Sequence, residues 1–243
     1  WISQVLDKDK SCKNALSRLI SYLVASGQPV PSTDTGGYCK ARKRLPERLL
    51  LRFVRQTGKQ SHAQSETEFL WCGRRVAVFD GSSMTMADTS KNQKKYPQPK
   101  SQAKGCGFPQ ARIVCGFSLS TGAVLDAAFS PLSAGEVTLF RQLYGNLETN
   151  DVALGDRMFG SYADICLLRE DGVDSAFRVH GARKTDFRKG KRLARWDHIV
   201  EWVKPKQCPP GLSTKLFGQL PETILLRETR FYITKKGFRT EDA

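Results

Sequence analysis

Two short apolar runs, each ending in an aspartate, constrain the fold of this chain most. The first is Arg75-Val-Ala-Val-Phe-Asp80-Gly, and the second is Asp151-Val-Ala-Leu-Gly-Asp156. The first run is β-branched and aromatic and too short for a helix, so it predicts a buried strand that an Asp-Gly turn closes. An Asp before a Gly is by itself usually turn chemistry. The pattern of an apolar run that ends in an aspartate occurs twice. Two strand-end carboxylates can therefore meet in the crevice at the carboxyl edge of a sheet.

The charge of the chain is strongly basic and unevenly spread. Lys and Arg number 39 against 24 Asp and Glu, which gives a net charge of +15 and a pI near 9.7. Three windows, 40–59, 91–104 and 183–206, carry +7, +5 and +6, so the rest of the chain is slightly acidic. A single basic window is often only a solvated face. Three of them together favour a polyanionic partner, and nucleic acid is the leading one.

Several other classes of protein are excluded by composition. A hydrophobic content of 40% with 13 Phe and 4 Trp excludes general disorder. No apolar run is long enough to span a bilayer, and no signal peptide is visible. The seven cysteines are odd in number and never form C-x-x-C, which indicates reduced thiols in a cytosolic chain without a zinc site. His62, His180 and His198 are isolated, which favours structural or exposed roles over metal ligation.

The remaining patterns predict the order of the elements. A long polar stretch at 85–109 has no periodicity, and a loop of that length inside a domain is usually functional or mobile. Ser133-Ala-Gly-Glu136 has the pattern of a capping box that opens a helix with Leu143 and Leu147 on its inner face. The other expected elements are helices at 12–25, from about 35, after Pro46 through Val54 and at 161–171, and strands at 112–119, 123–129, 152–155, 175–179 and 223–234.

Four motifs in this order resemble bacterial insertion-sequence transposases of the DDE type, whose core is RNase H-like. The motifs are Ser32-Thr-Asp-Thr-Gly-Gly-Tyr-Cys-Lys-Ala-Arg-Lys-Arg-Leu-Pro46, Val78-Phe-Asp80-Gly-Ser-Ser-Met-Thr-Met-Ala-Asp88-Thr, Asn92 with Tyr96-Pro-Gln-Pro, and Gly155-Asp156-Arg-Met-Phe-Gly-Ser-Tyr162. They span most of the chain.

The resemblance implies an α/β (α+β) fold with an RNase H-like mixed sheet flanked by helices. It places a helical N-terminal region at 1–70 and the first part of the catalytic core at 71–182. A mostly β insertion follows the second Asp at 183–243. It also implies that the two aspartate-bearing strands lie side by side, which the spacing alone does not show.

By the same resemblance, Asp80 and Asp156 are the first and second catalytic carboxylates and metal ligands. Cleaving a phosphodiester requires an activated water or 3′-hydroxyl and a neutralised leaving oxygen, which two Mg²⁺ ions supply together. Mg²⁺, or Mn²⁺ in its place, prefers oxygen ligands. Asp80 would bridge both ions, and Asp156 would complete one coordination shell. No organic cofactor is implied.

The family pattern has a third carboxylate that we do not find here. It is a Glu in Y-x-x-R-x-x-x-E on a late helix, whereas this sequence stops at Thr240-Glu-Asp-Ala243. Glu241 comes too early and in the wrong context to replace it. We therefore expect a truncated fragment without the C-terminal helix, whose full-length parent is the enzyme and which is itself inactive.

The expected partner is double-stranded DNA at the element ends and the target, and the resemblance allows a homodimer on DNA. Arg157 could reach a phosphate, although an internal salt bridge explains it as well. Trp196 and Trp202 could stack on a displaced base, but core positions are the commoner role of such a pair. The expected DNA contacts are Arg157, Lys94, Lys95, Lys100, Arg188, Lys189, Lys191 and Arg192.

The function expected from the resemblance is divalent-metal-dependent cutting and joining of DNA strands at the ends of a mobile element. The expected location is the bacterial cytoplasm, at the nucleoid, without membrane association. Two alternatives stay open: a catalytically inactive DNA-binding remnant of a transposase, and an RNase H-like nuclease that does not transpose.

Overall fold

A computed structural model describes residues 2–232 of the chain, which divides into two compact units, 1–53 and 54–243. The boundary between the units falls inside helix α4 (Glu47–Ala63). The division into 1–70, 71–182 and 183–243 expected from the sequence remains a prediction. None of the helices within residues 2–232 is long and apolar enough to cross a membrane.

The N-terminal unit is helical, as expected. It consists of α1 (Ile2–Leu6), α2 (Cys12–Ala25), α3 (Thr35–Lys43) and the start of α4. Ser11 caps α2 through its side chain, which accepts a hydrogen bond from the Asn14 N–H. The helix expected to end near Val54 continues as α4 to Ala63, and α1 was not foreseen.

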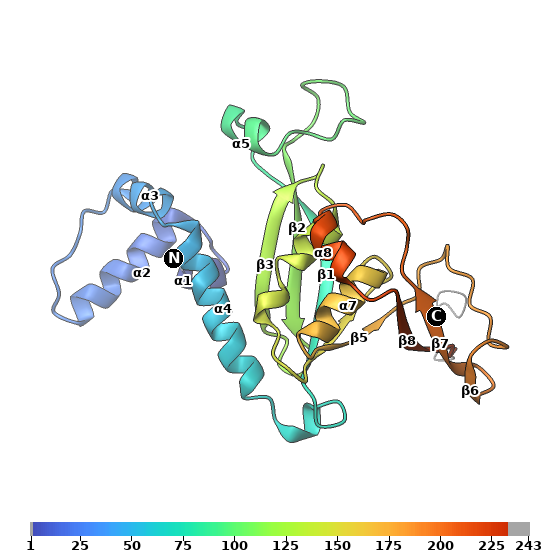
Figure 1. The fold of residues 1–243 in the computed structure, drawn as a ribbon. Coiled ribbons are helices and arrows are strands. Elements are labelled where there is room, and N and C mark those ends of the chain that lie inside the picture. Colours follow the sequence, from blue (N-terminus) through green and yellow to red (C-terminus); the bar gives the residue numbers. More distant parts are fainter. Residues whose placement is uncertain (1, 233–243) are drawn as a thin grey trace. The chain divides into compact units, whose positions relative to one another are not determined.

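The second unit is built on a five-stranded mixed sheet in the order β3-β2-β1-β4-β5 (Figure 1). β1 pairs with β2 antiparallel and with β4 parallel, which confirms the expected adjacency of the two aspartate-bearing strands. The mixed sheet with helices against it is the expected RNase H-like fold. The strands are β1 (Val76–Thr85), β2 (Gln110–Ser118), β3 (Val124–Pro131), β4 (Val152–Gly155) and β5 (Asp174–Phe177).

Strand β1 is longer than its sequence predicts. The Asp-Gly turn expected at Asp80 is wrong, because β1 continues to Thr85 and stays paired with β2 along its whole length. Only the parallel pairing with β4 stops, at the pair Phe79 and Gly155. The antiparallel partner provides main-chain hydrogen bonds beyond Asp80, and these outweigh the local preference of Asp-Gly for a turn.

One face of the sheet is covered by helices and carries the main core. Phe140 of α6 (Glu136–Arg141) packs edge-on against Phe79, with ring centroids 4.8 Å apart, and also contacts Phe159 at 4.7 Å. Side chains alternate between the two faces of a strand, so Ala77, Phe79 and Val114 share this buried face.

The capping box expected at the start of α6 is wrong. The N-cap is Gly135, which makes no side-chain cap bond, and Glu136 instead lies 3.5 Å from Arg112 across the sheet. The helix also ends earlier than expected, at Arg141, and a 3₁₀ turn, η2 (Tyr144–Asn146), follows it. Leu143 is nevertheless buried in the core.

Helix α7 (Tyr162–Glu170) confirms the expected helix after Asp156. Its N-cap is Ser161, whose side chain accepts a hydrogen bond from the Asp164 N–H, while the Ser161 hydroxyl donates to the Asp164 carboxylate. Arg141 donates from Nε to Asp164 Oδ1 at 2.8 Å and from Nη2 to Oδ2 at 3.2 Å. This ion pair joins α6 to α7 inside the protein.

The other face of the sheet is only partly covered in the described part of the chain. Val78, Ile113, Cys115 and Leu154 alternate with the core residues and are half-buried rather than buried. Asp80 belongs to the same alternation and is exposed. The aspartate therefore lies on the more open face.

The segment after residue 183 is mostly β, as expected. It forms a three-stranded antiparallel sheet in the order β6-β7-β8, and Trp202 of β7, Ile224 of β8 and Phe217 of the helix between these strands pack against α7. One short helix in it, α8, was not foreseen. The bounds are β6 (Lys191–Ala194), β7 (Asp197–Val203), α8 (Thr214–Gln219) and β8 (Thr223–Thr229). The last residues of the strand expected at 223–234, and Glu241, lie outside the described residues.

The long polar stretch between β1 and β2 is ordered by its own glutamines. It contains α5 (Ser90–Lys95), which the sequence did not predict, and it lies beyond the ends of β1 and β2 (Figure 1). Gln98 Oε1 accepts from the N–H groups of Gly105 and Gly107, and its Nε2 donates to the carbonyls of Gln102 and Ala103. Gln93 completes the arrangement, because its Nε2 donates to the Gly107 carbonyl and its Oε1 accepts from the Gln98 N–H.

Candidate active site

The strand register brings Asp80 and Asp156 together. The last parallel pair of β1 and β4 is Phe79 with Gly155; Asp80 is the next residue of β1, and Asp156 directly follows the end of β4. Neighbouring strands lie about 4.8 Å apart. The main chain therefore places Asp80 and Asp156 next to each other, at the point where the parallel pairing of β1 and β4 ends.

Each aspartate is held by a main-chain hydrogen bond and remains open to solvent. Gly81 N–H donates to Asp80 Oδ1 at 2.9 Å, and Met158 N–H donates to Asp156 Oδ1 at 2.8 Å. Both side chains are exposed. Burial, followed by the charges of Asp126 and Asp80, raises the pKa of Cys115, which pairs with Asp80 across β1 and β2.

These two carboxylates suit a divalent cation. They supply hard oxygen donors on neighbouring strands and stay exposed, which fits an ion that keeps several of its own waters. Within residues 2–232, no three His, Cys, Asp or Glu side chains gather into a metal-binding group. The described part of the chain therefore contributes Asp80 and Asp156 as candidate ligands.

Gly81, directly after Asp80, lies against the side chain of Glu136. A Cβ at this position would lie 2.8 Å from the carboxylate of Glu136. Glu136 and Arg112 thus approach the main chain of the site from the covered face. Sequence reasoning missed this pair, because the Glu136 pattern pointed to a helix cap.

The expected DNA contacts fall on three separate segments of the second unit. Lys94, Lys95 and Lys100 are exposed on the loop that Gln98 closes, and the Lys95 ammonium lies 5.1 Å from the centre of the Tyr96 ring. The positive charge of these lysines therefore lies on the loop that follows the strand carrying Asp80.

Arg157 follows Asp156 directly and is exposed. Its Nη1 lies 3.9 Å from the position that a Cβ on Gly181 would take. Among the described residues it makes no ion pair, so the internal salt bridge considered from the sequence is not found in residues 2–232.

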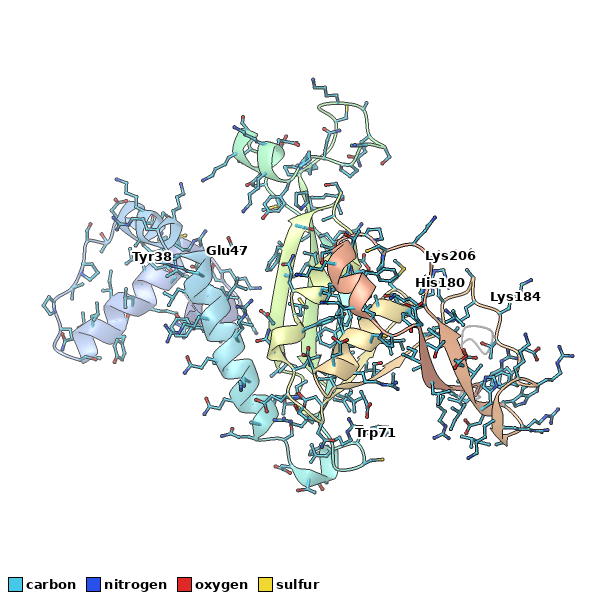
Figure 2. All side chains as sticks on the ribbon, in the orientation of Figure 1. Tyr38, Glu47, Trp71, His180, Lys184 and Lys206 are labelled. Carbon is cyan, nitrogen blue, oxygen red and sulfur yellow. The ribbon has the colours of Figure 1, made fainter. Side chains whose placement is uncertain are left out.

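The basic residues around β6 are exposed, but they are not equivalent. Arg188 donates to both oxygens of Asp186, at 2.9 and 3.1 Å, and these hydrogen bonds lower the pKa of Asp186 to about 2. Lys189, Lys191 and Arg192 are exposed. Nearby, the side chains of Lys184 and Lys206 point outward into solvent (Figure 2).

The two tryptophans have different environments. Trp202 is buried, with the Arg183 guanidinium 3.5 Å from its ring centre and its indole N–H donating to Glu228, so it belongs to the core. Trp196 is 38% exposed and packs edge-on against Phe187, with Arg230 near both rings. The sequence pattern treated the two as one pair, because it carries no information on burial.

The histidines have structural or exposed positions, as expected. His62 and His198 are buried, whereas His180 is exposed. His198 lies between the Lys189 carbonyl and the carboxylate of Glu228.

A mixed sheet with one aspartate on β1 and another directly after β4 fits the fold expected of a DDE-type domain. A family model described as a transposase DDE domain matches residues 71–239, and the chain belongs to this family. One similar protein is the transposase InsG for insertion sequence element IS4 of Escherichia coli (strain K12), 23% identical over 193 residues. The match covers 78% of this chain and 43% of InsG, so the chain spans less than half the length of that relative.

Proposed function

We propose that this chain is the DNA-binding and two-aspartate part of a transposase that cuts and joins DNA at the ends of an insertion sequence. The observation that carries the proposal is the register of β1 and β4, which brings Asp80 and Asp156 to neighbouring positions. Membership of the DDE domain family supports the same reaction class, because DDE transposase domains typically use divalent metal ions.

In this proposal Asp80 and Asp156 hold Mg²⁺ or Mn²⁺, with two ions in the whole enzyme. The ions would activate the attacking water or 3′-hydroxyl and neutralise the leaving oxygen. The main-chain bonds from Gly81 and Met158 orient the carboxylates of this chain. Arg157, next to Asp156, is placed to bind a phosphate of the strand being cut.

The remaining proposed contacts hold duplex DNA through its phosphates. Arg188 is already neutralised by Asp186, so it contributes less than its neighbours. Binding of this kind is independent of sequence and comes from counterion release. The proposed contacts outside the catalytic edge are Lys94, Lys95, Lys100, Arg188, Lys189, Lys191 and Arg192.

The test uses the protein encoded by the whole gene, incubated with element-end DNA and Mg²⁺ or Mn²⁺. Asp80→Asn and Asp156→Asn should each abolish strand cleavage and strand joining while leaving DNA affinity within about twofold, since phosphate contacts carry the affinity. Asp88→Asn is the matched control, because Asp88 is also an exposed aspartate but accepts a hydrogen bond from Gln93 in the loop. Cleavage by either site variant at the control's rate would refute the assignment.

A second candidate function is a DNA-binding protein without turnover. It is favoured by one observation, that residues 2–232 gather no metal-binding group of three. The 243-residue chain should then bind duplex DNA and leave it uncut with any divalent ion. Robust Mg²⁺-dependent cutting by this chain would contradict that candidate, and cutting without joining would favour a non-transposing nuclease.

A further inference from the structure

Three parallel strands of the five-stranded sheet end in one row. Phe79 of β1 pairs with Gly155 of β4, and Gly155 pairs in turn with Phe177 of β5. Asp80 follows the first of these positions, and Asp156 follows the second. The carboxyl ends of parallel strands meet at one edge of a sheet, which is where ligands of such sheets bind. The segment after Phe177 therefore leaves the sheet at the same edge as the two aspartates.

The segment after β5 lies against the loop that follows β4. A Cβ on Gly160 would lie 2.8 Å from the Cβ of Phe177 and 3.6 Å from the carbonyl oxygen of Arg178. A Cβ on Gly181 would lie 3.9 Å from Arg157 Nη1. These contacts hold the two segments together at two points. The residues between the two points therefore belong to the surroundings of the candidate site.

His180 lies between these points and is held by the turn that follows it. Its Nδ1 accepts a hydrogen bond from the Ala182 N–H at 3.2 Å, and its carbonyl accepts one from the Arg183 N–H at 2.8 Å. A ring nitrogen that accepts from an N–H carries no proton, so the ring carries its proton on Nε2. The residue is exposed. His180 therefore offers an oriented N–H donor at the protein surface.

This donor distinguishes His180 from the other histidines. His62 and His198 are buried, and both contact other groups of the protein through Nδ1. The lone pair of His180 Nδ1 is engaged by the Ala182 N–H. In this tautomer the ring donates a hydrogen bond and does not ligate a cation. The ligand that fits His180 is therefore a hydrogen-bond acceptor.

The charges around His180 favour an anionic acceptor. Residues 178–184 contain no carboxylate, and their three cations are Arg178, Arg183 and Lys184. Arg157 adds a positive charge from the neighbouring loop. A hydrogen bond to an ionised acceptor is roughly twice as strong as one between neutral groups. A phosphate oxygen of DNA meets both conditions.

The spacing of the strands indicates which phosphate this is. β5 is separated from β1 by β4, so it lies two strand spacings, or about 10 Å, from β1. Successive phosphates of one DNA strand are about 3.4 Å apart along the helix axis. With the cut phosphate at Asp80 and Asp156, the segment after β5 would reach a phosphate within about three nucleotides of the cut.

We propose that His180 is a further DNA contact of the candidate site, whose Nε2–H donates to a non-bridging oxygen of a phosphodiester within about three nucleotides of the cut. This contact rests on the proposed function, because it takes the cut phosphate to lie at Asp80 and Asp156. It differs from the contacts of lysine and arginine side chains, since a neutral ring adds no charge. It therefore contributes affinity without displacing a counterion.

The test measures binding of the 243-residue chain to a labelled element-end duplex by fluorescence anisotropy over a salt series. His180→Ala should weaken binding about tenfold, because a hydrogen bond to a charged oxygen is lost. The slope of log affinity against log salt should stay unchanged, since a neutral donor releases no counterion. His180→Gln retains an N–H donor and should bind within about twofold of the wild type. Gln219→Ala, at an exposed position at the end of α8, is the control.

Duplexes that carry one neutral methylphosphonate identify the phosphate that His180 contacts. At one position within about three nucleotides of the cut, the replacement should weaken binding of the wild type about tenfold more than binding of His180→Ala, which has already lost the contact. At other positions it should weaken binding of both proteins equally. Circular dichroism checks that His180→Ala keeps the wild-type fold.

The outcomes separate this contact from the proposed function. Equal affinities of the wild type and His180→Ala, or a loss that depends on no single phosphate, would overturn the contact. A slope flattened by about one unit in His180→Ala would show a charged ring and overturn the neutral donor. If the wild-type chain did not bind duplex DNA at all, the proposed function would fail as well. Loss of cleavage in Asp80→Asn of the whole-gene protein would support that function even where the His180 contact fails.

Discussion

At the scale of single residues, Asp164 joins α7 to Arg141 of α6 and to Tyr144 of η2. Its carboxylate is fully buried and accepts hydrogen bonds from Arg141, from Tyr144 at 2.5 Å and from Ser161. Burial and the charge of Asp164 raise the pKa of Tyr144, which therefore stays protonated and donates. Buried ion pairs of this kind tolerate the loss of one partner poorly.

Asp164→Ala should therefore destabilise the second unit by about 3–5 kcal/mol, because Arg141 is left buried without its counter-charge. Urea unfolding followed by tryptophan fluorescence measures the change. Asp171→Ala is the control, since Asp171 is exposed at the end of the same helix. A loss for Asp164→Ala no larger than that of the control would show that the pair is not required.

His62 gives the second unit a dependence on pH. Its side chain is buried, its Nε2 has no hydrogen-bond partner within residues 2–232, and Asp151 Oδ2 lies 3.9 Å from this nitrogen. Burial lowers the pKa of His62 below its usual 6.5, and the positive charge of Arg75 lowers it further. The negative charges of Asp151 and Glu148 raise this pKa, but the effect of burial is larger. The ring is neutral in the folded protein at neutral pH.

Since the unfolded chain binds this proton more readily, stability is complete above pH 6.5 and falls as the pH drops through the lowered pKa of the folded state. His62→Gln should remove that part of the pH dependence. Unfolding midpoints measured from pH 7.5 downward test it, with His180→Gln as the exposed control. Equal pH profiles for the wild type and His62→Gln would contradict the expectation.

At the scale of elements, the loop between β1 and β2 is held by the side chains of Gln98 and Gln93, and Gln98 offers the sharper test. Gln98→Ala removes four hydrogen bonds that close the loop. Each is worth about 1 kcal/mol net, so local opening should increase at least tenfold. Trypsin cleavage after Lys100 and Lys104 should accelerate accordingly, while the thermal midpoint of the sheet changes little.

Two variants control the loop experiment. Gln98→Glu keeps an acceptor for Gly105 and Gly107 but removes both donors, so its cleavage rate should be intermediate. Gln102→Ala leaves the carbonyl to which Gln98 donates, and it should be cleaved like the wild type. If Gln98→Ala were also cleaved like the wild type, the loop would be held by other contacts.

The elements differ in how well the sequence predicted them. Strands β2 to β5 were predicted correctly because their apolar runs are local sequence signals. Helix α7 was predicted because a Ser N-cap at its start and Gly172 after its end mark the same helix. The end of β1 and the start of α6 were predicted wrongly, because both depend on residues far away in the sequence. Pairing with β2 extends β1, and Glu136 forms an ion pair with Arg112 instead of capping α6. Helix α5 was missed because its six residues have no apolar face.

The candidate site was predicted in the same uneven way. The sequence indicated Asp80 and Asp156, and the family resemblance supplied their adjacency, which the strand register confirms. It could not show that Arg188 is paired with Asp186 or that Trp202 is buried while Trp196 is not. Such contacts depend on tertiary packing, which no local pattern encodes.

At the scale of the whole molecule, the basic segments should bind duplex DNA through counterion release. If on the order of eight phosphates are neutralised, log affinity against log salt should have a slope near −7. Replacing Lys189, Lys191 and Arg192 with Ala should flatten the slope by about three units, whatever the DNA sequence. Fluorescence anisotropy of a labelled duplex over a salt series measures it.

Arg188→Ala is the matched control for the salt series, since its guanidinium already pairs with Asp186 and it should change the slope by less than about one unit. If the slope of log affinity against log salt were unchanged in the triple variant, the basic residues 189–192 would be a solvated surface and not a DNA contact.

In the proposed DNA complex, the part of β1 beyond Asp80 would separate the two aspartates from the start of the lysine-bearing loop. From Asp80 to Thr85 the strand rises about 17 Å, at roughly 3.3 Å per residue. Duplex DNA rises about 3.4 Å per base pair, so in that complex a duplex running along β1 would place the start of the loop about five base pairs from Asp80. Adding two residues to both β1 and β2 beyond Asp80 should shift the phosphates protected by the loop about two base pairs further from the cut, without moving the cut itself.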